Sequence, residues 1–280
     1  PENLTTMAEV FNQNGFRTFC HSGHVRFAPQ YGHAKGFERF IYRQRDSKNF
    51  HIQAIHEAIL FLEAHKHEDC FIFIHLLDTH APFVPINYLN NHMASMHKDF
   101  SAYELGKKRG MDSYIEILRN QSQVKLFEVD LALGSLFDYC KQQNWFKNAV
   151  FTVTADHGHP YIPSAQKRLS QTRVNIPLFV RAPELKSGIE TRVIEGSIDM
   201  MPSLIKLAYL DVPDTVEGMP WPFLDINVKS FALTESLYEK KYNVSIRTKD
   251  WAWHYGCLFD ESRRKILEGQ EENMELHRII

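Results

Sequence analysis

The stretch CFIFIHLL, residues 70–77, decides the fold class of this chain. It follows a helical segment over residues 50–66, and the acidic pair Glu68-Asp69 separates the two. A short continuous apolar run of this kind, without alternation of polar and apolar residues, is typical of a strand buried on both faces. Such strands lie in parallel sheets that helices cover, and we therefore predict an α/β fold.

The same order of helix and strand recurs further along the chain. A longer helical region precedes a second apolar run over residues 149–154, and residues 176–181 form a third candidate for a buried strand. We expect both strands to lie with residues 71–77 in one mostly parallel sheet, with helices on both faces. One face of the longer helical region is predicted to be lined by Val124, Phe127, Leu131 and Cys140.

The sequence pattern changes from Phe231 onward. Short charged turns join three strand-like segments there, at residues 231–236, 242–248 and 251–259. This pattern predicts a small C-terminal antiparallel sheet. The expected organisation is a main α/β domain over residues 1–226 and an antiparallel subdomain over residues 227–280.

Composition excludes several classes of protein. The chain has 280 residues, of which 44% are hydrophobic and 24% charged, as in ordinary globular proteins. Lys and Arg number 32 against 34 Asp and Glu, so the chain lacks the basic excess expected of a nucleic-acid partner. No apolar stretch reaches the roughly 18 residues of a membrane span. The four cysteines show no CxxC spacing, which favours free and mostly buried thiols.

Polar residues with metal-binding chemistry follow two of the predicted strands. Asp78 and His80 come after the first strand, and Asp156 and His157 come after the second. Ligands bind beyond the carboxyl ends of strands in open parallel sheets, so we expect these residues to face one cleft, with Asp78 at its edge. A carboxylate and an imidazole can both bind a divalent ion. The alternative is a pair of turns whose polar residues are simply solvated.

Two longer stretches resemble the sulfatase branch of the alkaline phosphatase superfamily: TADHG at residues 154–158 and NIPLFVRAP at residues 175–183. In that family, a strand ending in S/T-x-D-H-G supplies two metal ligands, and a strand of the form V-P-L-I-hydrophobic-R-x-P follows. Other segments match in the family's order, and the resemblance covers nearly all of the chain. These further matches are residues 4–18, 75–83, 198–204, 217–219 and 273–276.

The resemblance implies a metal site and a histidine contact. Asp156 and His157 match two ligands of a divalent metal ion, which is calcium in many members and zinc or manganese in related phosphatases. His80 matches the histidine that contacts an oxygen of the transferred sulfate or phosphate group. For His80, the alternative is an ordinary histidine of a loop.

Three further residues are candidates for the same site. Lys167 lies ten residues before Pro177, one residue short of the spacing of the family's active-site lysine. His24 lies where the family often has a K-x-H segment, here without the lysine. An ordinary solvated lysine and a structural histidine are the alternatives for these two positions. His159 is a weaker candidate that would face the same cleft.

The resemblance implies a sulfuric ester hydrolase, a sulfatase, that acts on a small-molecule or saccharide sulfate ester. The alternatives are a phosphate ester hydrolase or phosphoethanolamine transferase of the same superfamily, and a non-catalytic binding module. The family's Asp-Asp metal pair and its nucleophile segment lie upstream of the part matched here, so we expect the 280-residue chain alone to have no appreciable turnover. A periplasmic or secreted location is expected from the resemblance only.

Overall fold

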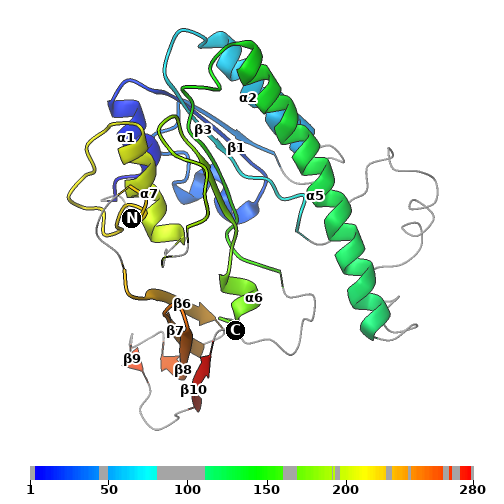
Figure 1. The fold of residues 1–280 in the computed structure, drawn as a ribbon, viewed down its shortest axis with the longest axis vertical. Helices are drawn as coiled ribbons and strands as arrows, with labels where there is room; N and C mark the ends of the chain where they lie inside the picture. Colours follow the sequence, from blue (N-terminus) through cyan, green and yellow to red (C-terminus); the bar gives the residue numbers. More distant parts are fainter. Residues whose placement is uncertain are drawn as a thin grey trace. The chain divides into compact units, whose positions relative to one another are not determined.

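The structure is a computed structural model that describes residues 4–43, 50–80, 111–159, 169–190, 192, 196–224, 229–238, 241–260, 265–266 and 272–278. Its contacts divide the chain into two compact units, Pro1–Asn148 and Ala149–Ile280. The first unit holds a parallel sheet flanked by helices, and the second holds an antiparallel sheet of C-terminal strands, which confirms the predicted α/β class (Figure 1). The division into residues 1–226 and 227–280 stays a prediction.

The parallel sheet of the first unit has three strands in the order β2-β1-β3. The central strand β1 (Arg17–Ser22) pairs in parallel with β2 (Arg39–Tyr42) on one side and with β3 (Cys70–Ile74) on the other. The apolar stretch that predicted a parallel strand therefore begins with one, although the strand ends at Ile74. Because β1 and β3 run in the same direction, the residues that follow them emerge at the same edge of this sheet.

Helices cover both faces of this sheet. Helix α2 (Phe50–Ala64) packs on one face, where Phe19 of β1 forms a core cluster with Ala58 and Phe61 of the helix. Helix α1 (Met7–Gln13) lies on the other face, where the ring of Phe11 stacks on Phe71 at 4.4 Å between centroids. Alternate residues of a strand point to opposite faces, which is why neighbouring strand positions serve the two helices.

Local sequence sets the ends of α1. Thr6 accepts a hydrogen bond from the Glu9 backbone N–H, and the Glu9 carboxylate accepts one from the Thr6 N–H. This reciprocal pair satisfies two N–H groups that the helix leaves unbonded at its start. Gly15 follows the helix with a φ of +85°, a left-handed conformation that glycine adopts without steric cost.

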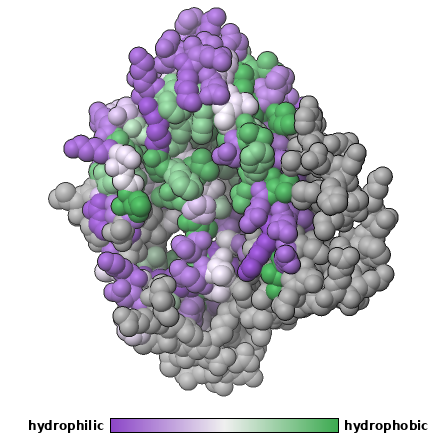
Figure 2. Space-filling view, turned by 45° about the vertical axis from the view of Figure 1, so that its right-hand side comes forward, coloured by the Kyte–Doolittle hydropathy of each residue, from purple (hydrophilic) through white to green (hydrophobic). Residues whose placement is uncertain are grey.

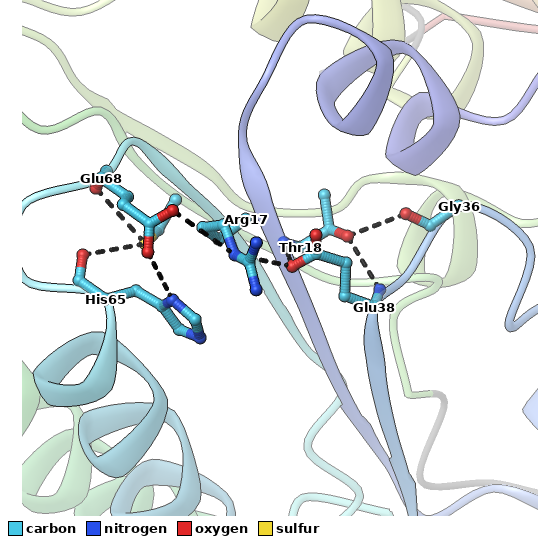
Figure 3. Close-up of polar contacts among 7 residues, drawn as sticks. Arg17, Thr18, Gly36, Glu38, His65 and Glu68 are labelled. Carbon is cyan, nitrogen blue, oxygen red and sulfur yellow. Dashed lines mark hydrogen bonds and ion pairs between the residues drawn. The ribbon is translucent and has the colours of Figure 1, made fainter.

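Charged side chains tie the amino end of β1 to its neighbours (Figure 3). The guanidinium of Arg17 lies 3.0 Å from the Glu38 carboxylate, and Glu68 accepts a hydrogen bond from His65 Nδ1 at 2.8 Å. The hydroxyl of Thr18 donates to the Gly36 carbonyl at 2.8 Å. The hydrogen bond from His65 lowers the pKa of Glu68, and the charge of Arg17 adds to this effect. These contacts lie at the end of the sheet opposite to the carboxyl ends of β1 and β3.

Helix α5 (Met111–Gln142) lies beside α2, but the predicted buried face is wrong in two positions (Figure 1). Phe127 and Leu131 are 55% and 57% exposed, whereas Cys140 is buried as predicted. Apolar spacing alone does not determine which side of a long helix meets its neighbour, and a charged pair can occupy buried positions if it is bonded. Lys125 and Glu128 form such an ion pair, at 2.6 Å. The buried positions of α5 are Leu118, Ser122, Lys125, Glu128, Ala132, Leu136 and Cys140.

The surface mixes apolar and polar side chains. In the space-filling view, apolar residues of the described part lie among hydrophilic ones (Figure 2). No helix among the described residues combines the length and the apolar character that crossing a membrane requires.

In the second unit, two of the strands predicted to share the parallel sheet pair with each other. Strand β4 (Phe151–Thr154) pairs antiparallel with β5 (Leu178–Arg181), which differs from the mostly parallel arrangement expected for these strands. Because β3 belongs to the first unit, the single sheet expected for all three strands stays a prediction. An apolar run indicates a strand, but it does not encode the partner or the direction of that strand, and Phe179 of β5 is 68% exposed although its run predicts a buried strand.

The C-terminal antiparallel sheet is confirmed. It contains β6 (Ala232–Tyr238), β7 (Lys241–Arg247), β8 (Trp251–Asp260) and β10 (Glu272–Arg278), and the short β9 (Lys265–Ile266) pairs with β8. The described residues of the unit also form the helices α6 (Gln171–Val174) and α7 (Gly196–Leu207). Buried Arg247 donates hydrogen bonds to the Leu169 carbonyl and, at 3.2 Å, to the Gln171 side chain. The C-terminal sheet is thus fastened to the segment that leads into α6.

The cysteines that the structure describes with their side chains are free thiols, as predicted. Cys20 and Cys140 are buried, and Cys70 is half-buried. Burial raises the pKa of all three thiols, and that of Cys70 rises to about 11 with help from nearby Glu68. Thiols with such pKa values are neutral at neutral pH and behave as small apolar side chains.

His21 makes the stability of the first unit depend on pH. It is fully buried beside Phe50, and neither ring nitrogen has a hydrogen-bond partner among the described residues. Burial, followed by the charge of Arg43, lowers the pKa of His21 to about 4. In the unfolded chain His21 therefore binds a proton below about pH 6.5, whereas in the folded chain it stays neutral down to about pH 4.

We expect the free energy of unfolding to fall by about 2 kcal/mol between pH 6.5 and pH 4 because of this group, with allowance for solvent screening. Urea unfolding at a series of pH values measures the slope. His21→Phe removes the titrating group and should flatten this part of the profile, whereas His56→Phe, at an exposed position of α2, should not. An unchanged slope in His21→Phe would show that other groups cause the dependence.

Candidate functional site

Asp156 and His157 lie directly after β4, and their side chains approach each other. Asp156 Oδ1 accepts a hydrogen bond from the backbone N–H of His157 at 2.8 Å, and its Oδ2 lies 3.6 Å from His157 Nε2. His157 Nδ1 donates to the carbonyl of Gly158 at 2.9 Å. A carbonyl oxygen only accepts, so Nδ1 carries the proton and Nε2 of the neutral ring presents a lone pair beside Asp156 Oδ2.

This arrangement fits the binding of a divalent ion. Histidines that bind metals usually donate their other ring N–H to a carbonyl or carboxylate, as His157 does here. A separation of 3.6 Å between an oxygen and a nitrogen donor also suits two ligands of one ion with bonds of about 2.0–2.5 Å. Among the described residues, no cluster of three or more His, Cys, Asp or Glu side chains is arranged to hold a metal. An ion bound there would take only part of its coordination shell from this pair.

Gly158 fixes the backbone of this pair against α6. Its N–H donates to the Arg173 carbonyl at 2.7 Å, and a side chain at this position would begin 2.0 Å from the Thr172 carbonyl oxygen. Only glycine permits this approach. The glycine of the DHG triplet therefore holds the two candidate ligands at the end of β4.

In the first unit, His80 lies at the end of a tight turn after β3. Its backbone N–H donates to the Leu77 carbonyl at 3.0 Å, so that Asp78 and Thr79 are the central residues of the turn. The side chain of His80 is exposed, whereas Asp78 is buried. The turn thus presents an imidazole at the carboxyl edge of the parallel sheet.

His24 lies near the same edge, after β1. Its Nδ1 accepts a hydrogen bond from the Arg26 N–H at 3.2 Å, so Nε2 carries the proton when the ring is neutral. Its ring lies 6.2 Å from that of His75, and His75 Nδ1 lies 3.3 Å from the buried Ser22 hydroxyl. His24 and His75 therefore flank the ends of β1 and β3, and His24 retains an N–H suited to an anion.

Two of the predicted site residues, Lys167 and His159, remain to be placed. Lys167 lies outside the described residues. His159 is described, and it follows the β4 turn in the second unit. His24 and His80 belong to the first unit, whereas Asp156 and His157 belong to the second, so the single cleft predicted for them stays a prediction.

Sequence reasoning missed a buried pair next to His80. His51, in the first turn of α2, donates from Nδ1 to Asp78 Oδ1 at 2.7 Å. These residues are 27 positions apart, and no spacing rule connects them. The available signal was a histidine in the first turn of a predicted amphipathic helix, together with an aspartate at the end of the apolar run of residues 70–77.

Comparisons with known proteins identify the family of the chain. The family model described as Sulfatase matches residues 1–210. Human arylsulfatase K is 19% identical over 176 residues, which cover 61% of this chain and 30% of that protein. The chain therefore spans less than a third of the length of this curated relative.

Two solved structures illustrate the shared fold. The phosphonate monoester hydrolase SpPMH from Silicibacter pomeroyi is 14% identical, with a TM-score of 0.68 over 94% of this chain and 74% of that one. BT33494S-sulf, from glycosaminoglycan metabolism in Bacteroides thetaiotaomicron, is 15% identical, with a TM-score of 0.62 over 99% and 70% of the two chains. With the family model covering three quarters of its residues, the chain belongs to the sulfatase family, within the alkaline phosphatase superfamily.

Proposed function

We propose that this chain is part of a metal-dependent sulfuric ester hydrolase. The observation that carries the proposal is the geometry of Asp156 and His157, whose Oδ2 and Nε2 atoms lie 3.6 Å apart with Nδ1 bonded to a backbone carbonyl. These two residues would hold a divalent ion, calcium first and zinc or manganese as alternatives. When bound, such an ion supplies Lewis acidity and positive charge to the ester oxygens.

Residues of the first unit would bind the transferred group. His80 is exposed at the edge of the sheet, where its imidazole N–H can donate to a sulfate oxygen. His24 can donate from Nε2, because its Nδ1 accepts the Arg26 N–H. Lys167 would add positive charge to the same group. Together these donors would stabilise the negative charge on the non-bridging oxygens of the sulfuryl group as sulfur passes to a nucleophile, while the electron pair of the S–O ester bond leaves with the alcohol oxygen.

The substrate class we propose is a small-molecule or saccharide sulfate ester. The membership of the sulfatase family supports the sulfate, and the glycosaminoglycan context of BT33494S-sulf supports the saccharide. A phosphate ester hydrolase or phosphoethanolamine transferase is the second candidate, because a phosphonate monoester hydrolase shares the fold. A periplasmic or secreted location follows from the family resemblance and belongs to the same proposal.

Ion binding tests the metal site. Calorimetric titration of the 280-residue chain with Ca²⁺, Mn²⁺ and Zn²⁺ should detect binding that Asp156→Ala weakens about 100-fold or more, because the ion loses one of its few protein ligands. Asp211→Ala removes an exposed carboxylate of the same unit and should bind as the unchanged chain does. Equal affinity in the Asp156 and Asp211 variants would favour a non-catalytic module.

Turnover tests separate sulfate from phosphate chemistry. Aryl sulfate and aryl phosphate esters should be compared with each of the three ions. We expect the chain alone to turn over neither ester appreciably. Ion-dependent turnover that Asp156→Ala abolishes would contradict this expectation, and the preferred ester would then identify the chemistry.

A further inference from the structure

The buried pair of His51 and Asp78 connects helix α2 to the turn that carries His80. His51 is 1% exposed and Asp78 is 8% exposed, and His51 Nδ1 lies 2.7 Å from Asp78 Oδ1. A carboxylate accepts this bond, so the imidazole donates it, and the ionised partner makes the bond stronger than one between neutral groups. The other carboxylate oxygen, Oδ2, is buried without a hydrogen-bond partner among the described residues. The bond from His51 is thus the one that fixes this carboxylate in the described structure.

The position of Asp78 in the turn gives this bond a consequence for His80. Asp78 follows Leu77, whose carbonyl accepts the backbone N–H of His80 at 3.0 Å. Within the turn, buried Asp78 is bonded to His51 of α2, whereas His80 at the end of the turn is exposed. A turn that is fixed at its centre can rotate less, so the direction of its last side chain is set as well.

We propose that His51 is a positioning residue for His80. By donating to Asp78, His51 holds the turn of residues 77–80 so that the His80 imidazole faces an oxygen of the transferred group. This inference rests on the proposed function, in which His80 contacts the transferred group. Partners of this kind that orient a functional group, without touching the substrate, typically change binding or activity by about 10- to 100-fold when removed.

Two similar substitutions isolate the bond to Asp78. The amide nitrogen of asparagine can occupy the place of Nδ1, whereas that of glutamine corresponds to Nε2, so His51→Asn keeps the donor and His51→Gln loses it. Neither variant introduces an apolar or a larger side chain. His56→Gln, at an exposed position of the same helix, is the matched control.

The experiment uses the 280-residue chain with ¹³C-labelled histidine and inorganic sulfate as the probe. In the sulfate-free chain, His51→Gln should shift the ring resonances of His80, whereas His51→Asn and His56→Gln should leave them in place. On titration, sulfate should bind His51→Gln about tenfold more weakly than the unchanged chain, and His51→Asn within about twofold of it. Unchanged His80 resonances and affinity in a folded His51→Gln variant would overturn the proposal.

Two further variants keep the outcome decisive. If His51→Gln loses its near-ultraviolet circular dichroism, Asp78→Asn takes its place, because it keeps the shape of the acceptor and weakens the bond by removing its charge. Its sulfate affinity should fall about threefold, and no change would overturn the inference. His80→Ala tests the proposed function separately, because a sulfate affinity equal to that of the unchanged chain would refute the contact of His80 with the transferred group. The His80 ring resonances of the sulfate-free His51→Gln variant would still test the role of His51.

Discussion

Replacing Gly158 with alanine is expected to destabilise the second unit by about 3 kcal/mol and to disrupt the Asp156–His157 pair. The added Cβ would lie 2.0 Å from the Thr172 carbonyl oxygen, which belongs to the backbone of α6 and cannot rotate away. The backbone must separate, and the 2.7 Å hydrogen bond from Gly158 to Arg173 is lost with it. Urea unfolding and ion titration measure the two effects.

The matched control is the same chemical change where space is available. Gly134 lies within helix α5, and a Cβ there would meet no atom within 4 Å. Gly134→Ala should therefore stabilise the chain by about 0.5–1 kcal/mol, because alanine is the better helix former. A Gly158→Ala variant that keeps its stability and its ion affinity would show that α6 moves freely, and would remove the argument that Gly158 positions the ligands.

Asp199→Ala is expected to lower the free energy of unfolding by about 3–5 kcal/mol. Asp199 is 2% exposed in α7, and its Oδ1 accepts from the Met219 backbone N–H at 2.9 Å and from Lys229 Nζ at 2.6 Å. The substitution leaves a largely buried ammonium group without this carboxylate and deprives a backbone N–H of its acceptor. Lys229 directly precedes the C-terminal sheet, so thermal and urea unfolding should both show the loss.

Two comparisons identify the cause of that loss. Asp138→Ala removes a carboxylate from an exposed pair with Lys141, at 3.0 Å, and should change the free energy by less than about 0.5 kcal/mol. The double variant Asp199→Ala/Lys229→Met removes both buried charges and should recover part of the stability. Equal effects of Asp199→Ala and Asp138→Ala would contradict a role for burial.

Much of the fold could be predicted because local patterns determine it. The C-terminal strands β6, β7 and β8 were predicted within a few residues, since charged turns separate strand-like segments there. The apolar run at β3 correctly indicated a strand of a helix-covered parallel sheet. Both predictions depend on signals contained in fewer than a dozen consecutive residues.

Long-range arrangement could not be predicted in the same way. The antiparallel pairing of β4 with β5 depends on which strand edges meet, and apolar runs carry no information about this. The exposed Phe127 and Leu131 of α5 show the same limit, because apolar spacing does not indicate which side of a helix is buried, and the buried Lys125–Glu128 pair satisfies its own charges.

The same distinction between local and long-range signals applies to the candidate site. Asp156 and His157 were identified because they directly follow an apolar strand, and the structure places their donor atoms 3.6 Å apart. The partnership of His51 with Asp78 needs the knowledge that the start of α2 lies beside the end of β3. Contacts between residues far apart in sequence are set by topology, which one sequence does not express.

The hydrogen bond between Gly158 and Arg173 has a consequence for evolution. It joins the two ends of the connection between β4 and β5, close to both candidate ligands and to α6. Residues inserted between Gly158 and Arg173 would enter and leave at points joined by this bond, and lengthening a connection costs little free energy, about 0.6 kcal/mol for each doubling. Substrate preference could therefore diversify through insertions in this connection while the candidate ligands Asp156 and His157 keep their positions.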